Sequence, residues 1–572
     1  MKFGDKKALA EFLAEYIPYL SEMEITSLIE IPPPEIDFTY AFPCFRLAKQ
    51  EKKSPAQIAQ NLTNRIVPPD FIELIEVQGP YINFRMNNKH LLNAIYQYKE
   101  DFGKIHAKSE EKKSFKPLNI VVEYPSPNTN KPLHLGHVRN MLIGNTISSL
   151  FQYAEHNVFQ VNLNNDRGIH ICKSMLAYRK TGNNAVPDKK PDHFVGDFYV
   201  KYQELKEEDE HIEEEALDML RLWEEKDPEV RELWRKMNKW AVEGFHETYK
   251  KFNIEFDKEY FESQYYEKGK DKVLEGLNQG IFEQREDGAI VANLNERYNL
   301  PDKVLLRSDG TSIYITQDIY LAYLKKKDFN YDKSIYIVGN EQDLYFKQLF
   351  AVLEMIGFQE DKYHLSYGMI SLPEGKMKSR EGKVVDADDL VAEMKQLAYE
   401  EVEKRYSTLS EEEKMERAET IGMSALRFFI LKFSPRSDFI FNPQESISFE
   451  GETGPYIQYC YARIQSIIDK SGKQIDPNIE FELLNDPKEI ALLNQMHYFP
   501  EIVEDSLDKY DTHLIPQYLL ALCQIFNSFY SSCPVISDNN DLEEARLFLI
   551  RCVQIIIRSG LNLLGIKVLK EM

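Results

Sequence analysis

The stretch LNIVVEYPSPNTNKPLHLGHVRNMLIGNTISSLFQYAEHNVFQVNLN, residues 118–164, decides the fold of this chain. It begins with a β-branched run bounded by prolines and continues through a polar, proline-rich loop. Apolar residues then recur at helical spacing from Ile143 to Ala154, and a second strand-like run follows at residues 158–164. This order of strand, loop, helix and strand predicts a βαβ unit with a parallel sheet.

The loop inside this unit has the chemistry of a phosphate site. A strand that turns into a helix brings free backbone N–H groups and the positive end of the helix dipole to one place. Gly136 lies between His134 and His137, so a nucleotide can approach the backbone and two imidazoles can donate to phosphate oxygens. Taken alone, this motif leaves a nucleotide site and an ordinary helix cap equally open.

A second loop supplies the other half of a nucleotide site. The stretch LPEGKMKSREGKVV, residues 372–385, is rich in lysine and follows the last predicted strand. A leaving pyrophosphate needs cations to take up the charge that builds on it, and Lys376 and Lys378 are the candidates. A solvated basic turn is the alternative for this loop by itself.

Together the two loops resemble those of the class I aminoacyl-tRNA synthetases. HLGH at residues 134–137 is similar to the HIGH motif, and KMKSR at residues 376–380 to the KMSKS loop. Within that class the chain resembles the arginyl-tRNA synthetases, through the block from Glu123 to Ile147 and through NDRGIHICKSM, TSIYITQD, GNEQDL, GETGPYIQYCYARI and GLNLLGI. The resemblance extends over most of the chain, from about residue 79 to residue 566.

The resemblance implies an ATP site made from both loops. Its expected members are Lys131, His134, Gly136, His137, Lys376, Met377, Lys378 and Ser379, and His134, His137, Lys131 and Lys376 are the expected catalytic residues. Ser379 occupies the place of the second lysine of the KMSKS consensus. Because arginyl-tRNA synthetases commonly lack that lysine, Lys131 just before the HIGH motif is its expected replacement, and the role of Lys378 stays open.

An arginine substrate presents a planar guanidinium, which carboxylates hold best in bidentate geometry. Glu123 ends the first predicted strand, at the edge where α/β sheets bind ligands, and Tyr314 and Asp318 are one helical turn apart. The resemblance adds Asn128 and Gln342 to these three as arginine-binding residues. It implies that Glu123 and Asn128 lie near the backbone end of arginine, and that Tyr314 and Asp318 lie near its guanidinium.

The composition fits a cytosolic protein of several domains. With 572 residues, 43% hydrophobic residues and scattered cysteines, the chain has room for about three or four domains and no cysteine spacing typical of zinc. No signal peptide or membrane span is expected. We expect a cytoplasmic monomer that uses ATP with Mg²⁺, without a protein-bound structural metal and without a membrane partner.

The expected fold is a Rossmann-type α/β catalytic domain with a small α+β domain before it and an all-α bundle after it. We place the N-terminal tRNA-binding domain and linker at 1–112, the catalytic domain at 113–395 and the helical anticodon-binding domain at 396–572. A helical insertion is expected at about 181–295, and the chain from about Asp388 onward is expected to be wholly helical.

A net charge of −23 excludes a surface that is basic throughout, but it leaves room for a local RNA site. Single-stranded RNA is read by aromatic stacking and by hydrogen bonds to base edges. The resemblance implies a site for a D-loop base in the N-terminal domain and an anticodon site in the bundle. The expected tRNA-binding residues are Tyr81, Asn83, Arg436, Tyr456, Tyr459 and Arg463.

The expected reaction is the ATP-dependent ligation of L-arginine to tRNA(Arg) through an arginyl adenylate, a reaction whose first step in this family generally needs bound tRNA. Another nucleotidyl transferase with an HxGH loop and a noncatalytic tRNA-binding paralogue are the alternatives. The first would lack the second loop and the helical C-terminus, and the second has no chemical reason to keep both loops. Among other synthetases, the cysteinyl enzyme would bring zinc ligands, and the leucyl, isoleucyl and valyl enzymes a larger editing insertion.

Overall fold

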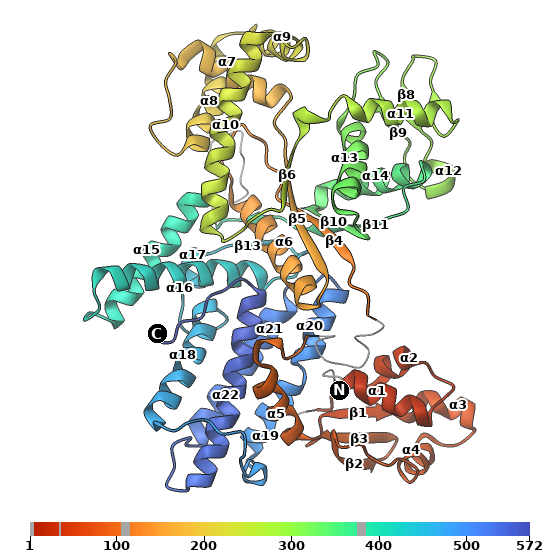
Figure 1. Cartoon of the computed structure of the whole chain (residues 1–572), viewed down its shortest axis with the longest axis vertical. Helices are drawn as coiled ribbons and strands as arrows, with labels where there is room; N and C mark the ends of the chain where they lie inside the picture. The colour runs from red at the N-terminus through yellow and green to blue at the C-terminus, as the bar shows by residue number, and fades with distance from the viewer. Residues whose placement is uncertain (1–4, 34–35, 105–114, 374–384) are drawn as a thin grey trace.

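The computed structural model describes residues 5–33, 36–104, 115–373 and 385–572, and a parallel sheet lies at its centre (Figure 1). Its five strands follow the order β11-β10-β4-β5-β6. Their bounds are β4 (Asn119–Glu123), β5 (Asn157–Asn164), β6 (Lys258–Phe261), β10 (Lys333–Gly339) and β11 (Asp361–Tyr367). Helix α6 (Leu135–Tyr153) connects β4 to β5, and the two strands pair in parallel with Asn119 opposite Asn157. The predicted βαβ unit and the Rossmann-type fold are confirmed.

Strand β4 lies in the middle of the sheet. The next strand along the chain, β5, pairs with one edge of β4, and the later strand β10 pairs with its other edge, where Ile120 is opposite Lys333. In open α/β sheets a ligand binds at such a switch point, outside the carboxyl ends of the strands. The predicted loop at residues 124–134 lies directly after the carboxyl end of β4.

Two insertions lie between strands β5 and β10 of the sheet, one before β6 and one after it. The first is helical and packs around its own core, which includes Trp223. It consists of α7 (Ile169–Thr181), α8 (Pro191–Glu208), α9 (Ile212–Glu224) and α10 (Pro228–Lys251). The second carries α11 (Lys268–Asn278), the antiparallel strands β7 (Glu283–Gln284), β8 (Ile290–Ala292) and β9 (Lys303–Leu306), and α13 (Tyr314–Phe329).

The structure therefore differs from the single helical insertion expected at about 181–295. The helices begin earlier, with α7, and β6 rejoins the main sheet within that range beside β5. Strands β7 and β8 lie in the same range. These strands have four residues or fewer, which is too short for a period of two to stand out from the charged residues around them.

The N-terminal domain is a small antiparallel sheet covered by helices. Its strand order is β1-β3-β2, with β1 (Tyr40–Pro43), β2 (Ile72–Gln78) and β3 (Tyr81–Met86). Helices α1 (Asp5–Tyr16), α2 (Glu22–Leu28) and α4 (Pro55–Thr63) pack on it around Leu9, Phe42 and Phe84. The predicted hairpin turns at Gly79, whose φ of 60° suits glycine.

After the sheet the chain is a helical bundle, with one exception. Its main helices are α15 (Ala387–Arg405), α16 (Glu411–Leu431), α18 (Gly454–Ser471), α19 (Pro487–His497), α20 (Phe499–Asp508), α21 (Leu514–Ser532) and α22 (Asn540–Leu563). The prediction of a wholly helical segment is wrong at β13 (Phe439–Ile440), which pairs with β12 (Ile370–Ser371) through backbone bonds that helical periodicity does not reveal. The expected boundary at residues 395 and 396 falls inside α15.

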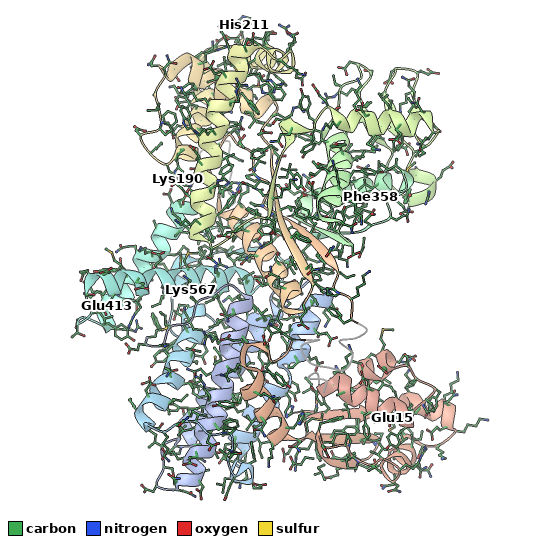
Figure 2. The ribbon with its side chains drawn as sticks, viewed as in Figure 1. Glu15, Lys190, His211, Phe358, Glu413 and Lys567 are labelled. Atoms are coloured by element: carbon green, nitrogen blue, oxygen red, sulfur yellow. The ribbon has the colours of Figure 1, made fainter. Side chains whose placement is uncertain are left out.

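The bundle and the catalytic sheet share one apolar core. Residues of α6, among them Met141 and Ile147, belong to the same buried cluster as Phe428 of α16 and Ile556 of α22. Figure 2 shows how closely side chains fill the space between these elements, with Glu413 marking one end of α16 and Lys567 the C-terminal segment. The helices of the described chain include none that is both long enough and apolar enough to span a bilayer.

Candidate active site

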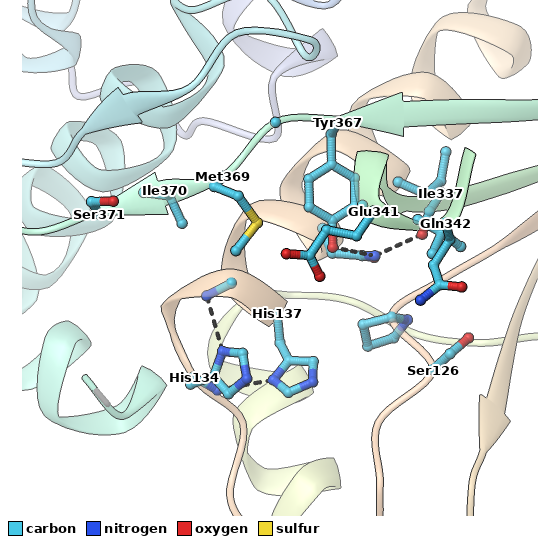
Figure 3. A pocket seen from close by; sticks show the side chains of 16 residues that line it. Ser126, His134, His137, Ile337, Glu341, Gln342, Tyr367, Met369, Ile370 and Ser371 are labelled. Atoms are coloured by element: carbon cyan, nitrogen blue, oxygen red, sulfur yellow. Dashed lines mark hydrogen bonds between the residues drawn. The ribbon is translucent and has the colours of Figure 1, made fainter. Parts of the chain in front are cut away.

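A cavity of about 550 Å³ opens at the carboxyl ends of β4 and β10 (Figure 3). The histidine loop forms one wall, and the ends of β10 and β11 form the other. The lining residues used below are Ser126, His134, Gly136, His137, Gln342 and Gly368. The structure thus brings three of the expected ATP residues together with Gln342, one of the expected arginine residues, at the switch point of the sheet.

His134 and His137 hold each other through the start of α6. His134 is the N-cap residue, and its Nδ1 accepts from the backbone N–H of Gly136 at 3.1 Å. The Nδ1 of His137 accepts from the backbone N–H of His134, also at 3.1 Å, and Figure 3 shows both bonds. A ring whose Nδ1 accepts carries its proton on Nε2 when it is neutral. Each imidazole therefore keeps an Nε2–H as a donor.

Both imidazoles are neutral at physiological pH. Burial is the main cause that lowers the pKa of His134 to about 4, with the nearby Lys131 ammonium adding to it. Burial, His134 and Lys131 in turn hold the pKa of His137 well below its ordinary value. A neutral pair can donate to a phosphate without itself becoming a cation.

Gly136 leaves the space that the His134 ring occupies over the start of α6. A Cβ at this position would lie 3.0 Å from Cε1 and 3.1 Å from Nδ1 of the His134 ring. These contacts are tighter than ordinary van der Waals packing, so a larger residue would push the ring off its cap. The glycine thus lets the histidine fold back over the helix start.

Arg139 anchors the same helix to the opposite wall, a role that the sequence analysis missed. Its guanidinium is 1% exposed and donates to the carbonyl oxygens of Gly368 at 2.5 Å, Pro435 at 2.9 Å and Ser437 at 2.7 Å. Gly368 lines the cavity, so the arginine fixes the distance between the histidine loop and this wall. In the sequence the residue stands out only as a charge four positions before Ile143, where the apolar helical pattern begins.

The lysine side of the site lies in a smaller cavity of about 190 Å³ next to His134. Lys131 lines it, and burial lowers the pKa of its ammonium. Within the described chain no carboxylate forms an ion pair with Lys131, which leaves the ammonium available to a phosphate. Lys376, Met377, Lys378 and Ser379 lie outside the described residues.

The chain re-enters the described structure beside the histidine loop. The backbone N–H of Leu135 donates to the carbonyl of Val385 at 3.0 Å, and that of Ala387 donates to the carbonyl of Leu133 at 2.9 Å. The end of the lysine-rich stretch is thereby fixed next to the histidines, as the two-loop interpretation of the sequence requires.

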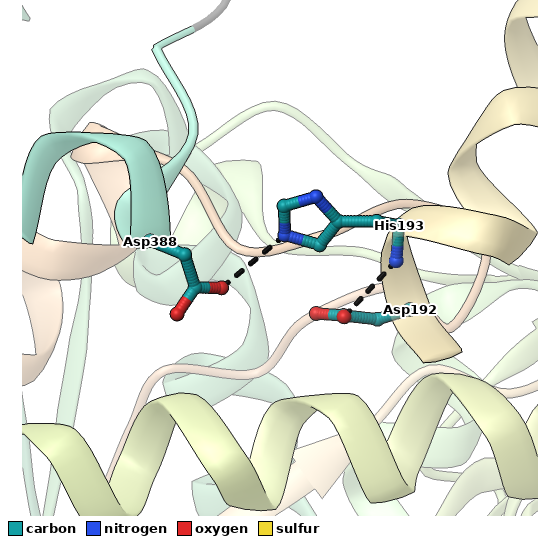
Figure 4. Close-up of side chains that lie close together, drawn as sticks. All are labelled: Asp192, His193 and Asp388. Carbon is teal, nitrogen blue, oxygen red and sulfur yellow. Dashed lines mark hydrogen bonds and ion pairs between the residues drawn. The ribbon is translucent and has the colours of Figure 1, made fainter. Parts of the chain in front are cut away.

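An ionic cluster fixes this point further (Figure 4). Asp388 accepts from Lys190 at 2.6 Å and Lys251 at 2.6 Å, and it lies 3.3 Å from His193 Nε2. These partners hold the pKa of the Asp388 carboxyl well below its usual range, whereas the carboxylates raise the pKa of His193 to about 10. Asp192, His193 and Asp388 have the spacing of metal ligands. The two lysines already balance their charge, so we assign the cluster to joining α8, α10 and α15.

Asp318, one of the expected arginine-binding residues, lies half-buried on α13. Its carboxylate accepts from the hydroxyl of Tyr345, the third residue of α14 (Asp343–Met355). Tyr314 lies one turn earlier, but its side chain is 68% exposed, and Asn128 is also exposed. Tyr345 was not among the site residues expected from the sequence, although it lies only three residues after Gln342.

A second carboxylate, Glu262, faces the same region and was also missed. Burial is the main cause that raises the pKa of Asp318 and of Glu262 to about 7 in each case, and the charge of Asp318 contributes to the shift at Glu262. Arg167 contacts Glu262 Oε1 at 3.4 Å, while Glu262 Oε2 and the Tyr265 hydroxyl are buried without a hydrogen-bond partner among the described residues. Such a group suits a planar cation with several N–H donors.

Glu123, another of the expected arginine-binding residues, is the last residue of β4, as the sequence predicts. Its side chain is buried, and its Oε2 accepts from the Lys325 ammonium at 2.8 Å. Like Asn128, Tyr314 and Asp318, Glu123 is absent from the lining of the 550 Å³ cavity. Its nearness to Asp318 is electrostatic, since its charge is one of the causes that raise the pKa of Asp318.

The expected tRNA residues lie in three places. In the N-terminal sheet, Tyr81 packs edge-on against Phe45 at 5.7 Å, whereas Asn83 is only 3% exposed and does not present its amide at the surface. Arg436 is exposed near β11, where it donates to the Tyr363 hydroxyl at 3.4 Å.

The remaining three expected residues form a cluster between α18 and α21. Arg463 lies over the Tyr459 ring at 4.6 Å and donates to Asn527 Oδ1 at 2.7 Å. Asn527 in turn donates to the Tyr456 hydroxyl at 2.8 Å. Tyr530, 5.3 Å from the Arg463 guanidinium carbon, completes an aromatic and basic surface that suits stacked bases.

Comparisons with known proteins agree with this arrangement. Family models match the chain at residues 6–86 (arginyl tRNA synthetase N terminal domain), 102–443 (tRNA synthetases class I (R), catalytic domain) and 457–572 (DALR anticodon binding domain). The chain is 44% identical to the arginine–tRNA ligase of Treponema denticola, over 95% of this chain and 94% of the relative. It is 43% identical to that of Parabacteroides distasonis, over 92% of each.

The structural comparison gives the same result. The Thermus thermophilus arginyl-tRNA synthetase superposes with a TM-score of 0.82 at 27% identity, over 99% of this chain and 100% of that one. The catalytic-domain model alone spans more than half of the chain, and the curated relatives cover nearly all of it. By its parallel sheet, its paired histidine loop and these comparisons, the chain belongs to the arginyl-tRNA synthetase family of class I aminoacyl-tRNA synthetases.

Proposed function

We propose that this chain ligates L-arginine to tRNA(Arg) in two steps at the switch point of its sheet. The arginine carboxylate attacks the α-phosphorus of ATP, giving arginyl adenylate and pyrophosphate. The terminal ribose hydroxyl of tRNA(Arg) then attacks the arginyl carbonyl, and AMP leaves. Neither step needs a covalent bond to the enzyme, so the protein contributes positioning and charge stabilisation.

The nucleotide end acts on the phosphates. His134 and His137 donate Nε2–H bonds to phosphate oxygens, because their Nδ1 atoms are occupied by backbone donors. Lys131 takes up charge on the leaving pyrophosphate, together with Lys376 and, where it reaches, Lys378. Mg²⁺ enters with ATP and neutralises phosphate charge when bound. Gly136, Met377 and Ser379 complete the ATP site.

The amino-acid end acts on the guanidinium. The observation that carries the proposal is a group made of the half-buried Asp318 and the buried Glu262 and Tyr265. Glu262 Oε2 and the Tyr265 hydroxyl have no hydrogen-bond partner among the described residues. A guanidinium supplies five N–H donors and a permanent charge, which is what this group lacks. Tyr314 contributes from the same helix, while Asn128 and Gln342 hold the backbone end of arginine.

The partner tRNA binds along the two outer domains. The cluster of Tyr456, Tyr459 and Arg463 reads anticodon bases, Tyr81 contacts the tRNA elbow, and Arg436 contacts its backbone. Asn83 supports Tyr81 from inside the sheet. We further propose a monomer that works in the cytoplasm, with domains at 1–112, 113–395 and 396–572, the last two of which share α15 at their boundary.

The test is ATP–pyrophosphate exchange with each standard amino acid, with and without tRNA(Arg). We expect exchange with arginine alone, and only when tRNA is present. The control is the same assay with a tRNA of another specificity, which should support little exchange. Exchange with any other amino acid at a comparable rate would overturn the proposal.

A further inference from the structure

The loop that follows β4 is held in place by two asparagines at the carboxyl end of β5. Ser126 of this loop lines the 550 Å³ cavity and has a φ of 57°, a left-handed conformation that a serine rarely adopts unless its neighbours hold it. Its backbone N–H donates to Asn162 Oδ1 at 3.2 Å, and its carbonyl accepts from Asn165 Nδ2 at 3.0 Å. Both asparagines therefore fix the path of the chain that leads to Asn128.

The two asparagines hold the loop in different ways. Asn165 also bonds through its backbone, since its N–H donates to the Pro127 carbonyl at 3.0 Å and its carbonyl accepts from the Thr129 N–H at 3.2 Å. Asn162 reaches Ser126 through its side-chain amide, whose oxygen accepts and whose nitrogen donates. The bond to the Ser126 N–H therefore forms only when the oxygen of that amide points toward the loop.

The orientation of the Asn162 amide is set by Glu259 on β6. The two residues pair in register between β5 and β6, and Asn162 Nδ2 donates to Glu259 Oε1 at 2.9 Å. Because a carboxylate can only accept, Glu259 attracts the nitrogen of the amide and turns its oxygen toward Ser126. Asn162 is 0% exposed, so an amide turned the other way would bury donors and acceptors without partners.

The neighbours of Glu259 keep it an acceptor. His246 Nε2, on α10, lies 2.6 Å from Glu259 Oε2, and Asn164 Nδ2 donates to Oε1 at 3.0 Å. Burial alone would raise the pKa of the Glu259 carboxyl, but the bonds from His246, Asn164 and Asn162 outweigh it and lower that pKa. The Tyr249 hydroxyl, 3.3 Å from Asn162 Nδ2, can both accept and donate, so it does not decide which way the amide points.

We propose that Glu259 and Asn162 are positioning residues for arginine: the carboxylate orients the amide, and the amide oxygen holds the loop that carries Asn128. The inference rests on the proposed function, because it assumes that this loop binds the backbone end of arginine. Glu259 and Asn162 lie outside the lining of the cavity, so both act through the backbone of Ser126.

An exchange of the acid and the amide tests the proposal. In Glu259→Gln the side chain can donate as well as accept, so it no longer fixes the Asn162 amide, and in Asn162→Asp two carboxylates face each other. Each single variant should lower kcat/KM for arginine about tenfold in ATP–pyrophosphate exchange, with KM for tRNA(Arg) near its wild-type value. The double variant Asn162→Asp/Glu259→Gln should return to within about twofold of wild type, because the new carboxylate accepts both from the new amide and from Ser126.

This rescue distinguishes hydrogen-bond polarity from packing, for which two changes in one buried contact should be at least as harmful as either alone. The matched control is Glu255→Gln, an exposed glutamate four positions before Glu259, which should behave as wild type. Should Asn162→Asp fail to fold, Glu259→Gln and the double variant still decide the matter, since the double variant should fold and be the more active of the two.

Wild-type kcat/KM in both single variants would overturn the inference. A double variant that does not fold, or that stays as impaired as the single variants, would do the same. Failure of the proposed function looks different, because the wild-type protein itself would then show no arginine-dependent exchange.

Discussion

The nucleotide end and the amino-acid end of the site are built in opposite ways. The nucleotide end is local: His134, Gly136 and His137 lie within four residues and hold one another through backbone bonds at the start of one helix. The amino-acid end is assembled from distant parts, since Glu123, Glu262, Asp318 and Tyr345 come from four different elements. The first end presents two neutral imidazole donors beside the Lys131 ammonium, and the second consists of buried or half-buried acids, which suits a polyanion at one end and a cation at the other.

The two ends therefore depend on different amounts of the fold. The histidine loop needs a strand, a glycine and a helix start, and its neutral state follows from burial beside Lys131. The acid cluster needs the whole sheet, because burial and groups from several elements, among them Glu123 for Asp318 and Arg167 for Glu262, set the pKa values of its carboxylates. Substitutions in the acid cluster should accordingly change the kinetic constants for arginine, whereas substitutions in the histidine loop should change the rate of the reaction at the phosphates.

The largest expected effect is at Asp318. In Asp318→Ala the guanidinium loses a buried, charged partner, and kcat/KM for arginine should fall about a thousandfold while KM for ATP stays nearly unchanged. ATP–pyrophosphate exchange with saturating tRNA measures both constants. Asp271→Ala, an exposed position on α11, is the matched control and should behave as wild type. Unchanged arginine-dependent exchange would show that Asp318 does not bind arginine.

At the nucleotide end the two nitrogens of His134 can be tested separately. In His134→Asn the amide oxygen can replace Nδ1 as the cap of α6, but the Nε2–H donor is lost. We expect kcat to fall about a hundredfold, with KM for arginine and the melting temperature near their wild-type values. His134→Gln, which extends an amide toward the Nε2 position, should retain more activity and lose stability. A reversal of this order would mean that the histidine serves as a cap only.

The same contrast explains which parts of the site could be predicted from the sequence and which could not. The βαβ unit and the histidine loop follow from residues 118–164, since periodicity and a capped loop are local properties. The spacing of Tyr314 and Asp318 made Asp318 a candidate, whereas Gln342 could be named only through resemblance. Glu262 and Tyr345 were missed because ordinary acids and tyrosines carry no local pattern. The ligand role given to Glu123 could not anticipate Lys325, which lies 202 positions away along the chain. Strand β6 was missed because four residues beside charged neighbours do not establish a period.

The smallest expected effect is a pH dependence that should appear at one end alone. The pKa values of Asp318 and Glu262 are raised to about 7, so both take up protons as the pH falls through neutrality. A protonated carboxyl no longer attracts a guanidinium, and kcat/KM for arginine should fall at least about tenfold per pH unit below pH 7. His134, with a pKa of about 4, does not titrate in this range, so kcat at saturating arginine and MgATP should change little between pH 7.5 and 6. Exchange rates measured against arginine concentration across this range separate the two constants. An arginine KM that stays flat while kcat falls would place the titrating group at the nucleotide end and reverse the assignment of acids and neutral donors to the two ends.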